Sequence, residues 1–224
     1  PTLRPSLKGA HWTWHFARSL LGWMCVTCMI AAVARMPVAV ATAISFLSPP
    51  LTMGLAVLMV GERLSPRKII AAVLALAGGM LILRPGTDAF QVSGVLALGA
   101  ACFMGLEVIF IKKLSDVEPA TRILFINNLI GATVSVAAAS LVWQSPGAQA
   151  WALLAARGVV MITAQAMFIQ SMKRGEASLV SPVFYAVLAF AAVLDFVFYG
   201  VLPTPFTLTG AALIVSGAVL VAAR

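Results

Sequence analysis

The stretch that decides the fold is residues 36–61, MPVAVATAISFLSPPLTMGLAVLMVG, which contains no charged side chain. A helix needs about 20 predominantly apolar residues to cross the hydrocarbon core of a bilayer. This stretch is long enough to do so, and the adjacent prolines Pro49 and Pro50 interrupt it near its middle. It therefore predicts a membrane-spanning helix with a break at mid-depth.

The remainder of the chain has the same character. Apolar residues make up 62% of the sequence and charged residues 10%, against roughly half and a quarter in a soluble domain, which excludes a water-soluble fold. Pro and Gly residues divide the two longest charge-free runs, at 143–147 and at 200–205. The sequence predicts an all-α polytopic membrane protein of eight transmembrane helices, drawn from charge-free runs at residues 19–34, 36–61, 69–83, 89–106, 123–156, 158–172, 177–194 and 196–223.

Basic side chains gather on one side of these predicted spans. Of the 15 Lys and Arg residues, all fall at helix ends on that side except Arg35, Arg84 and Arg157. Because Lys and Arg accumulate in cytoplasmic loops, both ends of the chain are predicted to be cytoplasmic. The basic residues flank apolar runs and do not form one basic face, so the net charge of +8 does not indicate a nucleic-acid partner.

The sequence also contains a weak internal repeat. Residues 61–83 realign with residues 200–222 at a constant offset of 139, with matched positions that include Pro66 with Pro205 and Gly78 with Gly217. The two segments enter the membrane from opposite sides. The predicted repeats are therefore inverted, as they are in many secondary transporters.

The repeat defines two predicted domains. Residues 91–222 form a complete repeat of five helices, whereas residues 1–86 supply three helices of its partner. We therefore expect two helices of the first repeat to be missing from the amino end.

Several motifs carry a family resemblance. Gly61-Glu62-Arg63 closes one predicted helix, Leu83-Arg84-Pro85-Gly86 ends the next, and the second half contains Glu118-Pro119 and Glu176-Ala177-Ser178-Leu179-x-x-Pro182-x-x-Tyr185. On these residues the chain resembles the EamA-domain proteins of the drug/metabolite transporter superfamily. The resemblance implies ten helices in two inverted five-helix repeats, in a bacterial inner membrane. Where the family usually has Gly-Glu-x-Pro, this chain has Gly200-Val201-Leu202-Pro203, without the carboxylate.

The predicted break at Pro49 and Pro50 is the first candidate site. Prolines within a span leave carbonyl groups without helical donors, which is tolerated only where the backbone faces protein or a watery cavity. Ser45 and Ser48 could supply hydroxyl groups and Phe46 an aromatic wall. A simple packing kink is the alternative interpretation.

Two carboxylates within predicted spans form the second candidate. Glu107 and Asp195 are costly in lipid unless they face a partner or water, so both are candidates for proton coupling, and Asp195 also for solute binding. For Glu107 we favour pairing with Lys112 or Lys113 near the membrane surface. Pairing with Arg157 is the alternative for Asp195.

Other polar residues in the spans are weaker candidates. Gln165 and Tyr185 are predicted either to line a cavity or to bond between helices, whereas Asn127 and Asn128 are predicted to bond between helices. His11 and His15, near Trp12 and Trp14, are predicted to be interfacial anchors. Cys25 and Cys28 are interpreted as packing residues, because a metal site would need further ligands. Pro182 is interpreted as a first-turn proline, because it lies close to the start of its predicted helix.

These features favour a secondary transporter that moves a small organic metabolite or drug by alternating access. An enzyme would need a nucleophile with its base, a metal quartet or paired acids, and none of these is visible. A non-transporting scaffold is the alternative, and it leaves the break at mid-depth unexplained. No nucleotide-binding Gly-x-x-x-x-Gly-Lys loop occurs, so we expect no cofactor. The expected partners are the lipid bilayer and a small-molecule solute. A homodimer is left open.

Overall fold

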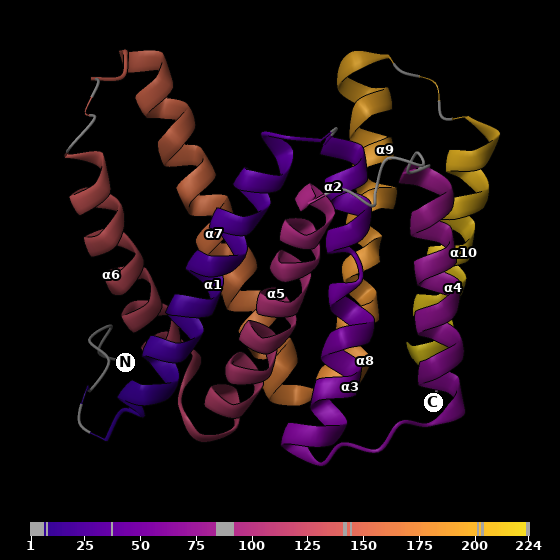
Figure 1. Cartoon of the computed structure of the whole chain (residues 1–224), viewed down its shortest axis with the longest axis horizontal. Coiled ribbons are helices and arrows are strands. Elements are labelled where there is room, and N and C mark those ends of the chain that lie inside the picture. Colours follow the sequence, from indigo (N-terminus) through magenta and orange to yellow (C-terminus); the bar gives the residue numbers. More distant parts are fainter. Residues whose placement is uncertain are drawn as a thin grey trace. The chain divides into compact units, whose positions relative to one another are not determined.

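The computed structural model describes residues 7, 9–36, 38–83, 92–140, 143, 145–200, 202 and 204–222. Outside this part of the chain lie Val201, Pro203 and residues 84–91, which include residues of the motifs quoted from the sequence, and three further basic residues, Arg4, Lys8 and Arg224. All the regular elements of the described chain are helices (Figure 1). Its elements are α1 (Trp12–Val33), α2 (Val38–Ser45), α3 (Ser48–Val60), α4 (Pro66–Leu83), α5 (Val92–Val117), α6 (Ala120–Ala139), α7 (Ala148–Arg174), α8 (Ala177–Val180), the 3-10 helix η2 (Ser181–Tyr185), α9 (Ala186–Tyr199) and α10 (Pro205–Ala222).

These elements follow the eight predicted spans of a polytopic membrane protein. Six stretches of the described chain are long and apolar enough to cross a membrane, and a shorter apolar helix covers Pro205–Leu220. Two predicted spans are broken. The second consists of α2 followed by α3, and the seventh of α8, η2 and α9, and each sequence of helices continues along one span in Figure 1.

The chain divides into two compact units. Unit 1 comprises residues 1–20 and 110–175, and unit 2 comprises residues 21–109 and 176–224. Helices α1 and α5 each contribute to both units. The predicted division into repeats at residues 1–86 and 91–222 is a different one, because it concerns sequence similarity and not compactness.

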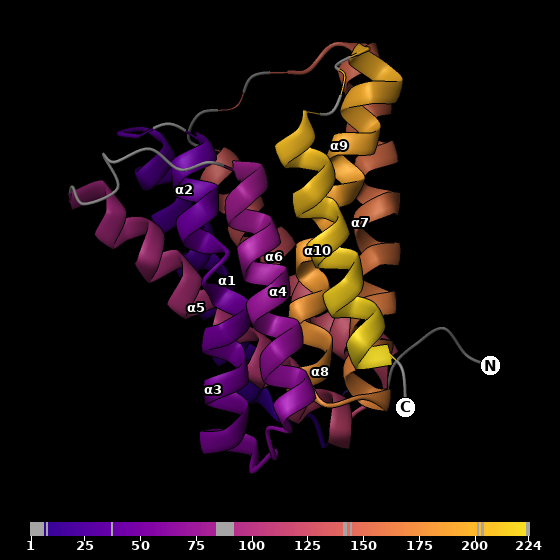
Figure 2. The same ribbon diagram turned by 90° about the vertical axis from the view of Figure 1, so that its right-hand side faces the viewer.

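In unit 2, α4 packs closely against α10, and the two helices lie side by side in Figure 2. A Cβ atom added to Gly78 would stand 2.4 Å from the carbonyl oxygen of Gly210. One added to Gly217 would stand 2.8 Å from the carbonyl oxygen of Ala71. Because the offset of 139 exchanges these two pairs, the α4/α10 interface is reciprocal, and glycine at both positions allows the backbones to approach.

In unit 1, polar side chains join α6 to α7 and to α1. Asn128 Nδ2 lies 3.3 Å from Gln165 Oε1, and Ser19 Oγ lies 3.4 Å from Asn127 Oδ1. Both asparagines therefore bond between helices, as predicted. Most of α7 is exposed, and only Ile169 and Met172 are buried in it.

Candidate functional site

The break in the second span lies just before the two prolines. Helix α2 ends at Ser45, and α3 begins at Ser48 with Pro49 and Pro50 in its first turn. Backbone N–H groups in a first turn have no intrahelical acceptor, so prolines there cost no hydrogen bond. The break predicted at Pro49 and Pro50 therefore lies at Phe46 and Leu47, and the two prolines start the second half of the span.

The carbonyl oxygen of Phe46, within this break, accepts a hydrogen bond from the hydroxyl group of Tyr185. In a continuous α-helix this oxygen would accept the N–H of residue 50, which is a proline and has none. Pro50 thus leaves the Phe46 carbonyl available to a partner from another span. The rings of Phe46 and Tyr185 also stack, with centroids 5.3 Å apart.

Tyr185 lies at the second break, which the sequence prediction missed. The seventh span was expected to be one helix with Pro182 in its first turn, but it changes to the 3-10 helix η2 and then to α9. Pro182 does occupy a first turn, that of η2. Phe46 and Tyr185 are separated by 139 positions, which is the repeat offset, so the two breaks meet at corresponding positions of the two repeats. Applying this offset to the first break would have indicated the second break in the sequence.

The contact between the breaks is buried. Tyr185 is 0% exposed and packs in a cluster with Ala75, Leu188 and Ile214. Phe46 packs against that cluster as a partly buried residue. The two predicted site residues are therefore brought together, as a contact between spans.

The remaining candidates at the first break bond within their own helices or pack. Ser45 Oγ donates to the carbonyl oxygen of Thr42 at 2.8 Å, and Ser48 is 3% exposed. A neighbouring cavity of about 330 Å³ has a mainly apolar lining that includes Pro50, with Met53, Gly54, Leu64, Ile69, Ala72, Val73 and Leu76.

Of the two carboxylates in predicted spans, Glu107 has a side chain that the structure describes and Asp195 does not. Glu107 packs against α1, where a Cβ atom on Gly22 would lie 3.3 Å from its carboxyl group. Its predicted pairing with Lys112 or Lys113 stays a prediction. Lys112 itself donates to Asp116 at 2.8 Å and to the carbonyl oxygen of Met172 at 3.0 Å. The side chain of Asp195, in α9, lies outside the described part of the structure.

A cluster in unit 1 was not predicted. Glu118 accepts hydrogen bonds from the backbone N–H of His11 at 2.7 Å and pairs with the rings of His11 and His15 at 3.1 and 3.0 Å. His15 and Glu118 are 1% and 2% exposed, so His15 is not the interfacial anchor that was expected. Burial acts to raise the pKa of the Glu118 carboxyl, but these hydrogen bonds outweigh it and hold the pKa below its ordinary value.

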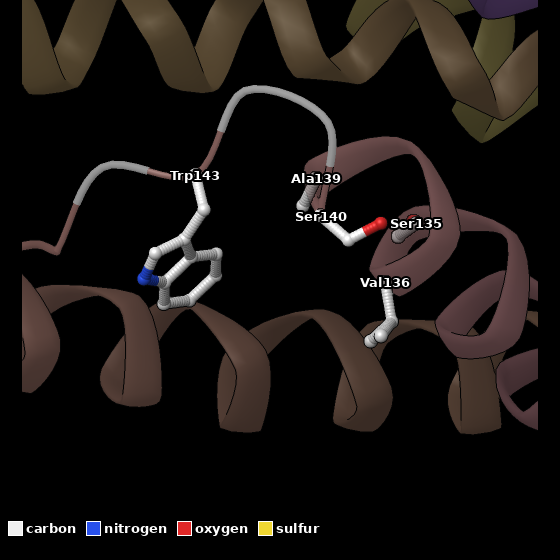
Figure 3. Close-up of a pocket in the computed structure, with 5 residues that line it drawn as sticks. All are labelled: Ser135, Val136, Ala139, Ser140 and Trp143. Carbon is white, nitrogen blue, oxygen red and sulfur yellow. The ribbon is translucent and has the colours of Figure 1, made fainter.

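Unit 1 also contains a recess at the end of α6. It has a volume of about 540 Å³ and is lined by Ser135, Val136, Ala139, Ser140 and Trp143 (Figure 3). None of these five is a predicted site residue. Among the described residues, no group of three His, Cys, Asp or Glu side chains is arranged to hold a metal ion.

A set of ionic contacts joins the loop after α3 to the start of α8. Gly61 ends α3 with a φ of 76°, in the left-handed region that favours glycine, and Glu62 follows. Its carboxylate accepts the backbone N–H groups of Ala177 and Ser178 at 2.7 and 2.9 Å. This role for Glu62 depends on residues far away in the sequence, where Glu62 stands out only as part of the Gly61-Glu62-Arg63 motif.

Lys68 completes these contacts. Its ammonium group donates to the Glu176 carboxylate, to Ser178 Oγ at 2.9 Å and to the carbonyl oxygen of Arg63 at 3.1 Å. We call the contacts of Glu62 and Lys68 with residues 176–178 the latch. The latch joins the far end of the second span to the beginning of the seventh.

Comparison with known proteins identifies the family. The model of the EamA-like transporter family matches residues 2–84 and 92–223, which is nearly the whole chain. The chain belongs to the EamA-like transporter family. It is therefore a membrane protein of a transporter family and not an enzyme, as the sequence motifs predicted.

Characterised relatives of the EamA-like chain are transporters of different solutes. It is 28% identical to a riboflavin transporter of Vibrio cholerae, over 95% of this chain and 72% of the relative. It is 26% identical to a pseudopaline exporter of Pseudomonas aeruginosa, over 88% and 70%. It is also 26% identical to an S-adenosylmethionine uptake transporter of Rickettsia felis, over 90% and 68%.

A solved crystal structure has the same fold. It superposes with a TM-score of 0.81 at 23% sequence identity, over 96% of this chain and 77% of that one. At this identity the match supports the EamA-like fold alone.

Proposed function

We propose that this protein is a secondary transporter that moves a small organic solute across the cytoplasmic membrane by alternating access. In this proposal residues 1–86 and 91–222 belong to two inverted repeats whose broken spans move relative to each other around the α4/α10 interface, and the chain termini are cytoplasmic. The supporting observation is the meeting of two broken spans, where the Tyr185 hydroxyl bonds the Phe46 carbonyl. Broken helices near the midplane are where transporters of this kind bind solutes.

The contact between the two breaks is of a kind that can separate when the broken spans move. It consists of one hydrogen bond and one ring stack, which can form and separate at a modest energetic cost. The reciprocal α4/α10 interface, by contrast, is a close backbone packing. We propose that α4 and α10 stay together while the broken spans separate and admit the solute beside Ser45, Phe46, Ser48, Pro49, Pro50 and Tyr185.

Two further features belong to this proposal. Gln165, bonded to Asn128 in unit 1, and Asp195 are proposed to face the solute path. Glu107 and Asp195 are the carboxylates proposed to carry a coupled proton, since a gradient must drive transport in a chain without a nucleotide-binding loop. The driving ion is tested by imposing a proton gradient during flux measurements.

The relatives support a proposal for the solute class. Riboflavin, pseudopaline and S-adenosylmethionine are the solutes named for those proteins. We propose a metabolite of this general kind for the present chain. The three compounds are therefore suitable first probes.

The experiment is flux into vesicles that carry the protein, with each labelled probe and with empty vesicles as the baseline. Saturable, protein-dependent flux of at least one solute is the expected result. A non-transporting scaffold would give flux equal to that of empty vesicles for every metabolite tested, at confirmed insertion, and this outcome would reject the proposal.

A further inference from the structure

The latch has no ionic counterpart at the positions that correspond to it in the other repeat. When the two halves are aligned with the offset of 139, uncharged residues stand opposite the two acidic residues, the lysine and the serine of the latch. Glu62 corresponds to Val201, Lys68 to Thr207, Glu176 to Pro37 and Ser178 to Ala39. If the repeats are inverted, the corresponding positions lie at opposite ends of the membrane.

We infer that Glu62 and Lys68 are positioning residues that hold one end of unit 2 closed, and that transport is gated unequally at its two ends. This inference rests on the proposed transporter function. The latch ties the loop after α3 to the start of α8, so it closes the two broken spans together at that end. The opposite end lacks charged groups at the corresponding positions and opens more readily.

The chemistry of the latch makes it strong enough to bias a conformational equilibrium. The Glu62 carboxylate makes two charge-assisted bonds to backbone N–H groups, and bonds of this kind are about twice as strong as neutral ones. The Lys68 side chain is 12% exposed whereas that of Glu176 is 54% exposed. Salt therefore screens the Lys68–Glu176 pair more readily than the bonds of Glu62.

The consequence is a preferred resting state. With the latch formed, the latched end is closed and the solute site is reached from the other end. Each transport cycle must then break the contacts of Glu62 and Lys68 to open the latched end. These residues act through the position of α8, without touching the solute.

The test measures how often the latched end opens, by a method that needs no solute. Ser181, in η2, is 1% exposed and bonds the Ala177 carbonyl oxygen at 2.7 Å. In a background with Cys25, Cys28 and Cys102 replaced by Ala, Ser181→Cys supplies one buried thiol beside the latch. A membrane-impermeant maleimide is applied from the latched side of oriented vesicles, and the rate of labelling is measured.

Glu62→Gln and Lys68→Met are each expected to raise this rate roughly tenfold, because a hydrogen bond to a charged group contributes about that factor to an equilibrium. The matched control is Asp116→Asn, which removes a carboxylate paired only with Lys112 among the described contacts, within α5. It is expected to leave labelling unchanged. Lys68→Met retains the hydrogen bonds of Glu62 to the backbone N–H groups. If Glu62→Gln does not fold, the labelling rate of Lys68→Met alone tests the inference.

The outcomes for the latch and for the transporter proposal are separate. Labelling of both latch variants at the parent rate, in protein that is folded, would overturn the latch whatever the flux shows. Faster labelling with no flux of any metabolite by the parent would support the latch as a closure and reject the transporter proposal. If Asp116→Asn were also labelled faster, the faster labelling of the latch variants would be explained by the loss of any charged group, and this outcome would also overturn the inference.

Discussion

At Tyr185 a buried hydroxyl group bonds the carbonyl oxygen that Pro50 leaves without a helical donor. Tyr185→Phe keeps the ring stack with Phe46 but leaves that carbonyl without its partner. The free energy of unfolding is expected to fall by about 1–3 kcal/mol, the cost of an unsatisfied buried acceptor. Thermal unfolding in detergent measures it.

Ser45→Ala is the matched control for this prediction. Its hydroxyl bonds a carbonyl oxygen of its own helix, and such local bonds contribute little to stability. A Tyr185→Phe variant as stable as the parent would show that the contact between the two breaks contributes nothing.

Glu118 predicts a dependence of stability on pH. Its folded-state pKa lies below the ordinary value of 4.5, so the folded protein holds this proton less tightly than the unfolded chain. The contribution to stability is therefore complete above about pH 4.5 and is lost as the pH falls through the folded-state pKa. Glu118→Gln is expected to flatten the fall in Tm below pH 5, whereas Asp116→Asn should retain the parent's profile.

The residues that sequence could and could not predict differ in where their partners lie. Tyr185, Phe46 and Glu107 stand out in the sequence as candidates because polar or proline-flanked residues in an apolar run are conspicuous. The long-range contacts of Glu62 and Glu118 were not predicted because these residues lie at span ends, where a charge is ordinary. Their partners are more than 100 positions away, and no local pattern indicates them.

At the scale of elements, the two broken spans carry the proposed mechanism. Replacing Pro49 and Pro50 together by Ala supplies the N–H groups that a continuous helix would direct to Ser45 and Phe46. The straightened span then competes with Tyr185 for the Phe46 carbonyl. Initial flux at matched membrane abundance is expected to fall roughly tenfold, the effect of about one hydrogen bond on the equilibrium, while the protein still folds.

Cys25→Ala with Cys28→Ala is the control for the proline variant, since these residues are interpreted as packing. Its flux should stay near that of the parent. Unchanged flux in the proline variant would reduce the break to a packing kink and move the proposed site toward Gln165.

The α4/α10 interface gives a second prediction at this scale. Gly78→Ala would place a methyl group 2.4 Å from the Gly210 carbonyl oxygen, so the helices must separate, at a cost of about 1–3 kcal/mol. Gly131→Ala in α6 is the control, because its Cβ would meet nothing within 4 Å, and alanine favours a helix by up to about 1 kcal/mol. Equal stability of the two variants in thermal unfolding would contradict the close packing of α4 and α10.

Element boundaries show what hydropathy can and cannot predict. The apolar runs gave the order of the spans, and the predicted cut between the fifth and sixth spans falls between the end of α6 at Ala139 and the start of α7 at Ala148. The interruption of the seventh span was missed because Pro182 is compatible with an ordinary first turn. The change from α8 to η2 is accompanied by tertiary contacts of Tyr185, which composition does not reveal.

At the scale of the whole molecule, the central claim is that one site opens in turn to the two sides of the membrane. Such a carrier exchanges solutes, so solute on one side accelerates the movement of labelled solute from the other side. A scaffold shows no movement, and an open pore shows no acceleration.

The most direct measurement is therefore counterflow in vesicles that carry the protein. Vesicles are loaded with unlabelled riboflavin, pseudopaline or S-adenosylmethionine, or with another metabolite that shows flux, and the entry of the same labelled compound is timed. The account predicts faster initial entry into loaded than into empty vesicles, saturable with concentration and reduced by the Pro49 and Pro50 replacement. Protein-dependent entry that is equally fast with and without internal solute, or no protein-dependent entry of any compound, would contradict it.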